Sequence, residues 1–252
     1  EHLWMSNLDF VGNSAYHGGA IYNQASSPMM MRLDIKSNSA AFTDLGKGGG
    51  IFNGADSNPI IRETSIRGNI AAFGGAVYND GNANTVVNSL FSGNVSNMAG
   101  GAIYNNNSSP KFTNVTLVSN YSKNTNSGGG IYNLGSDSKV KFINSILYGN
   151  IPTQYSNNGG VMSVTYSDIQ GGHSGDGNIN LNPLFVNLIS AQDKPTPAGD
   201  FHLTVSSPCI DTGINDAVIT PIIYLKDLEG LQRIFDGDAN GTATVDVGSY
   251  EY

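Results

Sequence analysis

Six charged side chains near the N-terminus are the residues best suited to chemistry in this sequence. They are Asp9, Arg32, Asp34, Lys36, Glu63 and Arg67. Two carboxylates held about 5 Å apart can bind a cation, share a proton or act as the acid and the nucleophile of a retaining glycosidase. The same six groups can instead neutralise one another as surface ion pairs, each worth under about 1 kcal/mol. The residue types alone leave both interpretations open.

A second candidate is the acidic stretch "DGDANGTATVD" at residues 236–246. Its opening residues match the first calcium ligands of an EF-hand loop, but Val247 stands where an EF-hand has its bidentate glutamate. A turn rich in Asp and Gly, without metal, is the competing interpretation. The candidate calcium ligands are Asp236, Asp238, Asn240 and Asp246, and the sequence indicates no other cofactor.

Motifs for other chemistries are absent from the sequence. There is no GxSxG elbow, phosphate-binding loop or dinucleotide fingerprint, and the four histidines share no spacing. With one cysteine, Cys209, the sequence offers no intrachain disulfide and no zinc-ligand spacing. The net charge of −8, without a basic run, argues against nucleic acid as a partner. No segment reaches the ~18 apolar residues of a membrane span.

Two short phrases recur along the chain and predict the elements that position these side chains. "GGAIYN" or a close variant begins at residues 18, 48, 74, 100 and 128, at intervals of 26 to 30 residues. The second phrase is an apolar residue, two others and Asn: "FVGN", "IKSN", "IRGN", "FSGN", "LVSN" and "LYGN". The segments between the phrases vary in length, which is typical of stacked strands with looped-out turns.

The composition and the runs between the phrases predict an all-β protein. Glycine is abundant, at 32 residues, and charged residues are only 13%. Runs such as "PIIRETSI" and "TVVNSLF" are β-branched, aromatic and bounded by Gly, Asn, Ser or Pro, whereas a helical repeat needs a 3.6-residue apolar period. A right-handed parallel β-helix, a pectin-lyase-like solenoid with coils of about 25–30 residues, fits best.

Equivalent residues of stacked coils lie about 4.8 Å apart, so residues that repeat form ladders along the solenoid. The glycine pair allows a sharp turn with positive φ and a close approach of adjacent backbones. Asparagine side chains in register can hydrogen-bond from coil to coil. We therefore expect two asparagine ladders: Asn23, Asn53, Asn79, Asn105 and Asn133, and separately Asn13, Asn38, Asn69, Asn94, Asn120 and Asn150.

Strand alternation separates an inner face from an outer face. The Ile or Val of the six-residue phrase is expected inside and the aromatic residue beside it outside, where it can stack on sugar rings or be covered by a loop. These candidate ligand-binding residues are Tyr22, Phe52, Tyr78, Tyr104 and Tyr132. Counting back from the asparagine of the second phrase places the six charged residues in three outward columns, two, four and six residues before it, on the first three coils.

The alternation of the two phrases resembles the polymorphic outer-membrane-protein repeats of bacterial surface adhesins and autotransporter passengers, over roughly residues 7–150. The series "GNINLNPLFVN", "DFHLTVSSPCIDTG" and "VDVGSYEY" resembles the closing segment of bacterial β-helix proteins, which often precedes a surface-anchoring module. We expect coils over residues 1–160, then last coils and a C-terminal cap over residues 161–252. The resemblance implies a secreted or cell-surface location on a bacterium and a chain that is part of a longer protein.

Three functions are compatible with this architecture. The most strictly repeated residues serve stacking, which favours a non-catalytic module that acts in adhesion by binding a glycan or a host or cell-surface protein. The alternative is a polysaccharide lyase or glycoside hydrolase that acts through the charged patch, because β-helices of these enzymes carry carboxylates, Lys or Arg on an outer strand face. The third interpretation is a ligand-free spacer.

Overall fold

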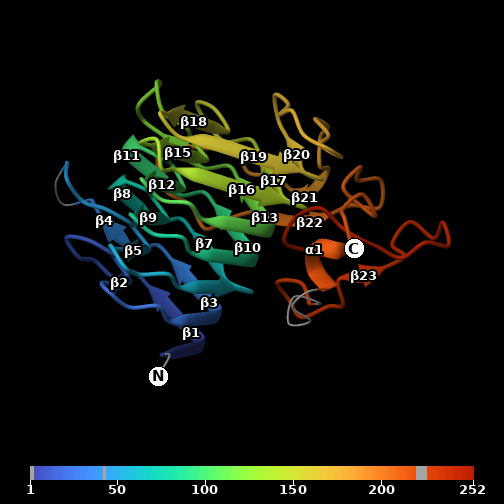
Figure 1. The fold of residues 1–252 in the computed structure, drawn as a ribbon, viewed down its shortest axis with the longest axis horizontal. Helices are drawn as coiled ribbons and strands as arrows, with labels where there is room; N and C mark the ends of the chain where they lie inside the picture. The colour runs from blue at the N-terminus through green and yellow to red at the C-terminus, as the bar shows by residue number, and fades with distance from the viewer. Residues whose placement is uncertain (1–2, 42–43, 220–225) are drawn as a thin grey trace.

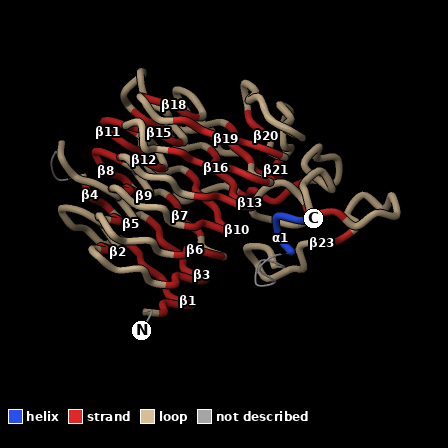
Figure 2. The backbone as a smooth tube through the Cα atoms, in the orientation of Figure 1, coloured by secondary structure: helices blue, strands red, loops and turns tan. Residues whose placement is uncertain are grey.

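The computed structural model describes residues 3–41, 44–219 and 226–252, and it shows a solenoid of short strands and turns with a C-terminal segment beside it (Figure 1). Short strands joined by turns coil around a common axis, and each coil adds its strands to the same sheets (Figure 2). Strands of successive coils pair in parallel throughout these sheets. The predicted parallel β-helix is therefore confirmed.

Three parallel sheets make up the solenoid. The ten-stranded sheet contains β1 (Trp4–Val11), β3 (Met29–Lys36), β6 (Ile60–Arg62), β7 (Ser65–Arg67), β10 (Thr85–Ser92), β13 (Lys111–Val118), β16 (Lys139–Ile143), β17 (Ile146–Tyr148), β19 (Val161–Thr165) and β20 (Asp168–Ile169). The four-stranded sheet contains β4 (Ser39–Ala40), β8 (Ile70–Phe73), β11 (Val95–Ala99) and β14 (Tyr121–Ser122). The six-stranded sheet contains β2 (Ile21–Asn23), β5 (Ile51–Asn53), β9 (Val77–Asp80), β12 (Ile103–Asn106), β15 (Ile131–Leu134) and β18 (Tyr155–Asn158). We number the coils 1 to 6 from β1 to β18, and β19 opens a seventh.

Both asparagine ladders are confirmed. Asn23 Nδ2 donates to Asn53 Oδ1 at 2.9 Å, and the same bond repeats from coil to coil as far as Asn157, one step beyond the prediction. The second ladder runs from Asn13 to Asn150 with Nδ2–Oδ1 distances of 2.8 to 3.0 Å. Because these amides are almost all buried, each rung satisfies polar groups that water cannot reach.

The glycine pairs act at the turns as expected. Gly48 has a φ of +65°, a left-handed conformation that glycine adopts without a steric penalty. At Gly49, a Cβ atom would lie 2.2 Å from the carbonyl oxygen of Gly75 in the next coil. Inside the turns, Ile51, Ile103 and Ile131 are buried in the main core, which confirms the predicted inner face.

The residue six positions before the second-phrase asparagine bends the strand in every coil. Its φ lies between +48° and +54° in Asn7, Arg32, Glu63, Asn88, Asn114 and Asn144. Strand alternation does not predict this left-handed bend, which also separates β6 from β7 and β16 from β17. Asparagine tolerates this conformation better than most residues, which explains why it holds the position in four of these six coils.

The C-terminal segment packs along the side of the solenoid. It contains β21 (Phe185–Asn187), β22 (Asp200–Leu203), α1 (Asp216–Ile219), β23 (Ile234–Phe235) and β24 (Thr244–Val245), with β21 and β23 antiparallel to β22 and β24. Figure 1 shows it in orange and red beside the ten-stranded sheet. A second core joins outward side chains of coils 4 to 6 to this segment; it consists of Leu90, Val118, Ile146, Phe185, Phe201, Leu203, Cys209, Ile210 and Val247.

The bend asparagines of coils 4 to 6 bind the C-terminal segment through its backbone. Asn88 Nδ2 donates to the Lys226 carbonyl. Asn114 Nδ2 donates to the Asp246 carbonyl at 3.3 Å, and Asn144 exchanges two bonds with Ile214 at 2.9 and 3.1 Å. The segment therefore covers a lateral face, and the expected cap over the last coil is not confirmed. No helix among the described residues is long and apolar enough to cross a membrane.

Candidate functional site

The strand register brings the six charged residues together on the outer face of coils 1 to 3. Asp9 lies beside Asp34, and Lys36 lies beside Arg67. Arg32 and Glu63 occupy the left-handed bend at the same level of coils 2 and 3. Non-glycine residues other than asparagine are held in this conformation at a cost of about 1 kcal/mol or more, and such positions cluster at functional sites. The patch that the sequence predicts is therefore present.

Ion pairs occupy most of the carboxylates in this patch. Asp34 binds Lys36 Nζ at 2.5 Å through one oxygen and Arg67 Nη2 at 3.3 Å through the other. Glu63 is buried and binds Arg32 Nε at 2.9 Å, while its second oxygen contacts Arg62. Both carboxylates have both oxygens engaged, so neither is free to act as an acid or a base in this arrangement. Asp9 is exposed and has no ion-pair partner among the described residues.

The C-terminal segment turns the patch into a groove of about 370 Å³. The solenoid wall carries Asp9, Arg32, Asp34, Glu63 and Arg67. The opposite wall carries Leu228, Glu229 and Tyr250, so a ligand in the groove would meet both charge signs, an aromatic ring and an apolar side chain.

His202 stands behind the second wall of the groove. Its Nδ1 lies 2.6 Å from Asp200 Oδ1, and its Nε2 lies 3.3 Å from Glu229 Oε2. Partial burial disfavours the charged imidazole, but the bonds and charges of the two carboxylates outweigh it and raise the pKa of His202. The ring centroid is 4.0 Å from that of Tyr250, so the histidine supports two residues of the wall.

The aromatic side chains of the six-residue phrase form one continuous stack. Ring centroids of neighbours lie 4.8 to 5.6 Å apart along Tyr22, Phe52, Tyr78, Tyr104 and Tyr132. The three central rings are buried against Phe73, Ala99 and Leu134, whereas Tyr22 is 53% exposed. Burial also raises the pKa of Tyr104 to about 12. Sugar stacking on this stripe stays a prediction, and the exposed ring area lies mainly at Tyr22.

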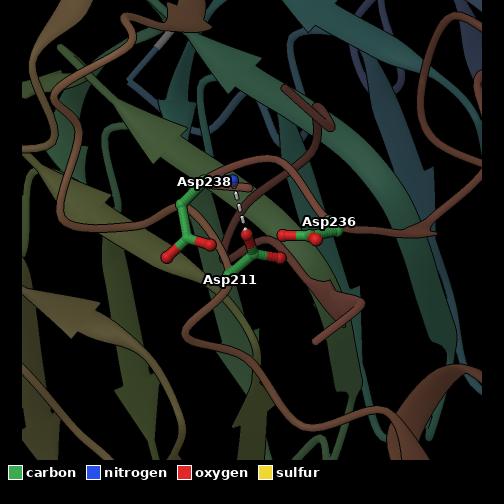
Figure 3. Close-up of side chains that lie close together, drawn as sticks. All are labelled: Asp211, Asp236 and Asp238. Carbon is green, nitrogen blue, oxygen red and sulfur yellow. Dashed lines mark hydrogen bonds between the residues drawn. The ribbon is translucent and has the colours of Figure 1, made fainter. Parts of the chain in front are cut away.

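The acidic loop brings together three carboxylates, from Asp211, Asp236 and Asp238 (Figure 3). One ligand oxygen of each lies within 4.8 Å of the others, and the Asp238 N–H donates to Asp211 Oδ2 at 2.8 Å. Asn240 is adjacent, because its N–H donates to Asp236 and Asp238 at 3.0 Å. An oxygen-rich cluster of this kind suits calcium chemically. Calcium binding stays a prediction.

Asp246, the remaining calcium candidate, lies outside this cluster. Its side chain is buried and accepts the N–H groups of Asp211 at 2.8 Å and Tyr252 at 2.7 Å. Burial raises the pKa of its carboxyl to about 6. Asp246 therefore anchors the C-terminal residues. The third carboxylate of the acidic cluster comes from Asp211, whereas the sequence interpretation had expected it from Asp246.

A buried arginine holds the last residues of the chain together. Arg233 is fully buried, pairs with Glu251 at 3.2 Å and donates to the Gly248 carbonyl at 2.8 Å. Its Nε donates to Asn88 Oδ1 in coil 4 at 3.2 Å. Burial, opposed by the charge of Arg233, raises the pKa of Glu251 to about 9. The cluster fixes Tyr250, which carries one side of the groove.

Sequence reasoning missed the second wall of the groove and one carboxylate of the acidic cluster. Glu229, Tyr250, His202 and Asp211 all belong to the non-repeating segment, so no ladder places them. A signal did exist on the solenoid: the bend column carries uncharged asparagine in coils 4 to 6 and charged residues in coils 2 and 3. The asparagines of coils 4 to 6 are the ones that bind the C-terminal segment.

Comparison with known proteins finds one repeat family that is similar to two segments of the chain. The sequence profile of the Chlamydia polymorphic membrane protein repeat matches residues 7–24 and 88–106, and each match spans a second phrase and a whole six-residue phrase. No curated protein and no solved structure matches the chain significantly. The chain is therefore a parallel β-helix in which two segments are similar to the Chlamydia polymorphic membrane protein repeat, and this similarity points to a module of a bacterial outer-membrane or surface protein.

Proposed function

We propose that this chain is a non-catalytic binding module of a bacterial surface protein, displayed outside the cell, which acts in adhesion by holding a glycan or a protein of another surface. The proposal rests on the ion pairs that the carboxylates of the charged patch form within the protein. Both oxygens of Asp34 and of Glu63 already contact cations of the protein. Carboxylates held in ion pairs stabilise the arrangement of the surface and are poorly suited to proton transfer.

The elements that repeat support the same proposal. Asparagine, glycine and isoleucine ladders are used in stacking the coils, and the aromatic ladder is largely covered. Two recesses instead lie where the non-repeating C-terminal segment meets the solenoid, and the charged groove is one of them. A rigid scaffold with recesses formed by connecting segments is a common arrangement in binding proteins.

The test is to apply the purified chain to immobilised polysaccharides and to host and bacterial surface proteins, and to measure binding and cleavage in the same samples. We expect binding of at least one glycan or protein without new reducing ends or unsaturated products. Failure to bind any member of a broad panel would support the spacer interpretation and contradict adhesion.

A polysaccharide lyase or glycoside hydrolase is the second candidate, favoured by one observation. Arg32 and Glu63 hold the left-handed conformation in the groove, with Tyr250 and Glu229 on the opposite wall. If the groove is catalytic, turnover of uronic-acid or neutral polysaccharides should be lost in Asp9→Ala and Asp34→Ala. Turnover that survives both substitutions would place any activity elsewhere.

A further inference from the structure

A recess larger than the charged groove lies away from it, where coils 5 and 6 meet the opening of coil 7. It has a volume of about 840 Å³, within the range of small-ligand sites. The corner after β17 forms its floor, the turn after β20 forms one side, and residues 188–191 of the C-terminal segment form another. The residues used below are Tyr148, Ile151, Gln154, Tyr155, Gln170 and Leu188.

The recess exists because the repeat stops at this corner. In coils 2 to 5 the second phrase is followed by a strand of the four-stranded sheet, and that sheet ends at β14. In coil 6 Ile151 makes an isolated bridge to Tyr121, and the chain proceeds directly to β18 without the glycine-pair phrase. The space that a further strand and turn would fill is therefore left open.

The asparagine ladder ends in this recess as a chain of glutamines. Asn150 Nδ2 donates to Gln154 Oε1 at 2.6 Å, and Gln154 Nε2 donates to Gln170 Oε1 at 2.8 Å. Gln170 also accepts the Gly149 N–H at 2.8 Å and is exposed. Its Nε2 has no hydrogen-bond partner within the described parts of the chain, so a fixed amide offers donors to a ligand.

The lining chemistry matches an uncharged, hydroxyl-rich ligand. Among the described residues that line the recess, none carries a charge. Tyr148 and Tyr155 supply amphipathic rings, Ile151 and Leu188 supply apolar surface, and amides and hydroxyls complete the wall. An ionised ligand would lose hydration here without meeting a counter-charge, which is unfavourable. Sugar units, with apolar faces and hydroxyl edges, pair with both kinds of wall.

We propose that this recess binds a neutral oligosaccharide, held by the Gln170 amide and packed against Tyr148, Tyr155 and Leu188. The inference rests on the proposed function, since it names the ligand class and the place of binding for a surface-binding module. The site differs from the charged groove in position and in lining, so the two can be tested separately.

The experiment uses the full chain and short neutral glucan, mannan, galactan and chitin oligosaccharides, with uronic-acid oligosaccharides and an extended peptide as competitors. Affinities are measured by calorimetry for the parent chain, Gln170→Ala and Leu188→Glu. The matched control is Leu181→Glu, a similarly exposed leucine that does not line the recess. Circular dichroism and thermal melting of every variant establish that the solenoid is intact.

We expect at least one neutral oligosaccharide to bind, and both recess variants to weaken its binding about tenfold, because one removes a hydrogen-bonding amide and the other places a charge in an uncharged recess. Leu181→Glu should bind as the parent does. Neutral sugar binding that is unchanged in both recess variants would overturn this site while leaving the binding function intact. Binding of only the acidic sugar or only the peptide would overturn the ligand class. No binding by any surface ligand would overturn the proposed function as well.

Discussion

Replacing Asn94 by alanine removes one rung from the middle of a buried ladder. Its Nδ2 donates to the Ile66 carbonyl and to Asn120 Oδ1, both at 2.9 Å. Its Oδ1 accepts the N–H and the side-chain amide of Asn69 at 2.9 and 3.0 Å. Alanine ends all four bonds at once and leaves a space where the amide stood.

The magnitude follows from the partners left behind. Four polar groups each lose one bond in the interior, where an unmade hydrogen bond costs about 1–3 kcal/mol. Because the Asn69 and Asn120 side chains keep other partners, we expect a total loss of about 3–6 kcal/mol in the free energy of unfolding. A typical domain has only about 5–15 kcal/mol, so Asn94→Ala should be close to unfolding.

Urea denaturation followed by circular dichroism measures this loss. The matched control is Asn13→Ala, at the exposed end of the same ladder, where one side chain donates a single bond to Asn38. We expect the control to lose under about 1 kcal/mol. Equal, small losses in the two variants would refute the reasoning that the ladder holds the coils together.

Three further predictions address the C-terminal segment and its charges. Arg233→Met should destabilise the segment by about 3–5 kcal/mol, because the buried Glu251 side chain and the Gly248 and Tyr250 carbonyls lose the guanidinium that donates to them, and limited proteolysis should then release the segment before the coils are cut. The pKa of Asp168 is raised from 3.8 to about 6 by burial, so the folded state holds its proton more tightly and stability falls as the pH rises from about 4 to about 6. Asp168→Asn should flatten that fall by up to about 3 kcal/mol in denaturation curves taken across this range, and an unchanged slope would exclude the assignment. Millimolar calcium should raise the Tm of metal-free protein but not of Asp238→Asn or Asp211→Asn, and an unchanged Tm in the parent would remove the calcium hypothesis.

The repeating part of the fold could be predicted from the sequence because each coil is specified locally. Glycine pairs, asparagines and apolar residues return at nearly constant spacing, so the register of Asp9 with Asp34 follows from counting. Strand alternation correctly predicted that Ile51, Ile103 and Ile131 lie on the inner face. It did not reveal the left-handed bend, although asparagine at positions 88, 114 and 144 was the residue type that tolerates it.

The C-terminal segment was the part that local patterns could not place. Its docking depends on contacts between residues more than one hundred positions apart, such as Asn88 with Arg233. A solenoid requires some cover for its last coil, which made a terminal cap the natural expectation. The outward apolar residues Leu90, Val118 and Ile146 instead made a lateral face available, and the segment buries it.

The central proposal is that this chain is a non-catalytic binding module whose recess holds a neutral glycan without cleaving it. The most direct measurement is to capture a defined neutral oligosaccharide mixture on the immobilised chain, release it and determine the masses. The account predicts that the retained oligosaccharides are recovered intact and that Leu188→Glu retains about tenfold less of them. Recovery of shortened or unsaturated products would contradict it.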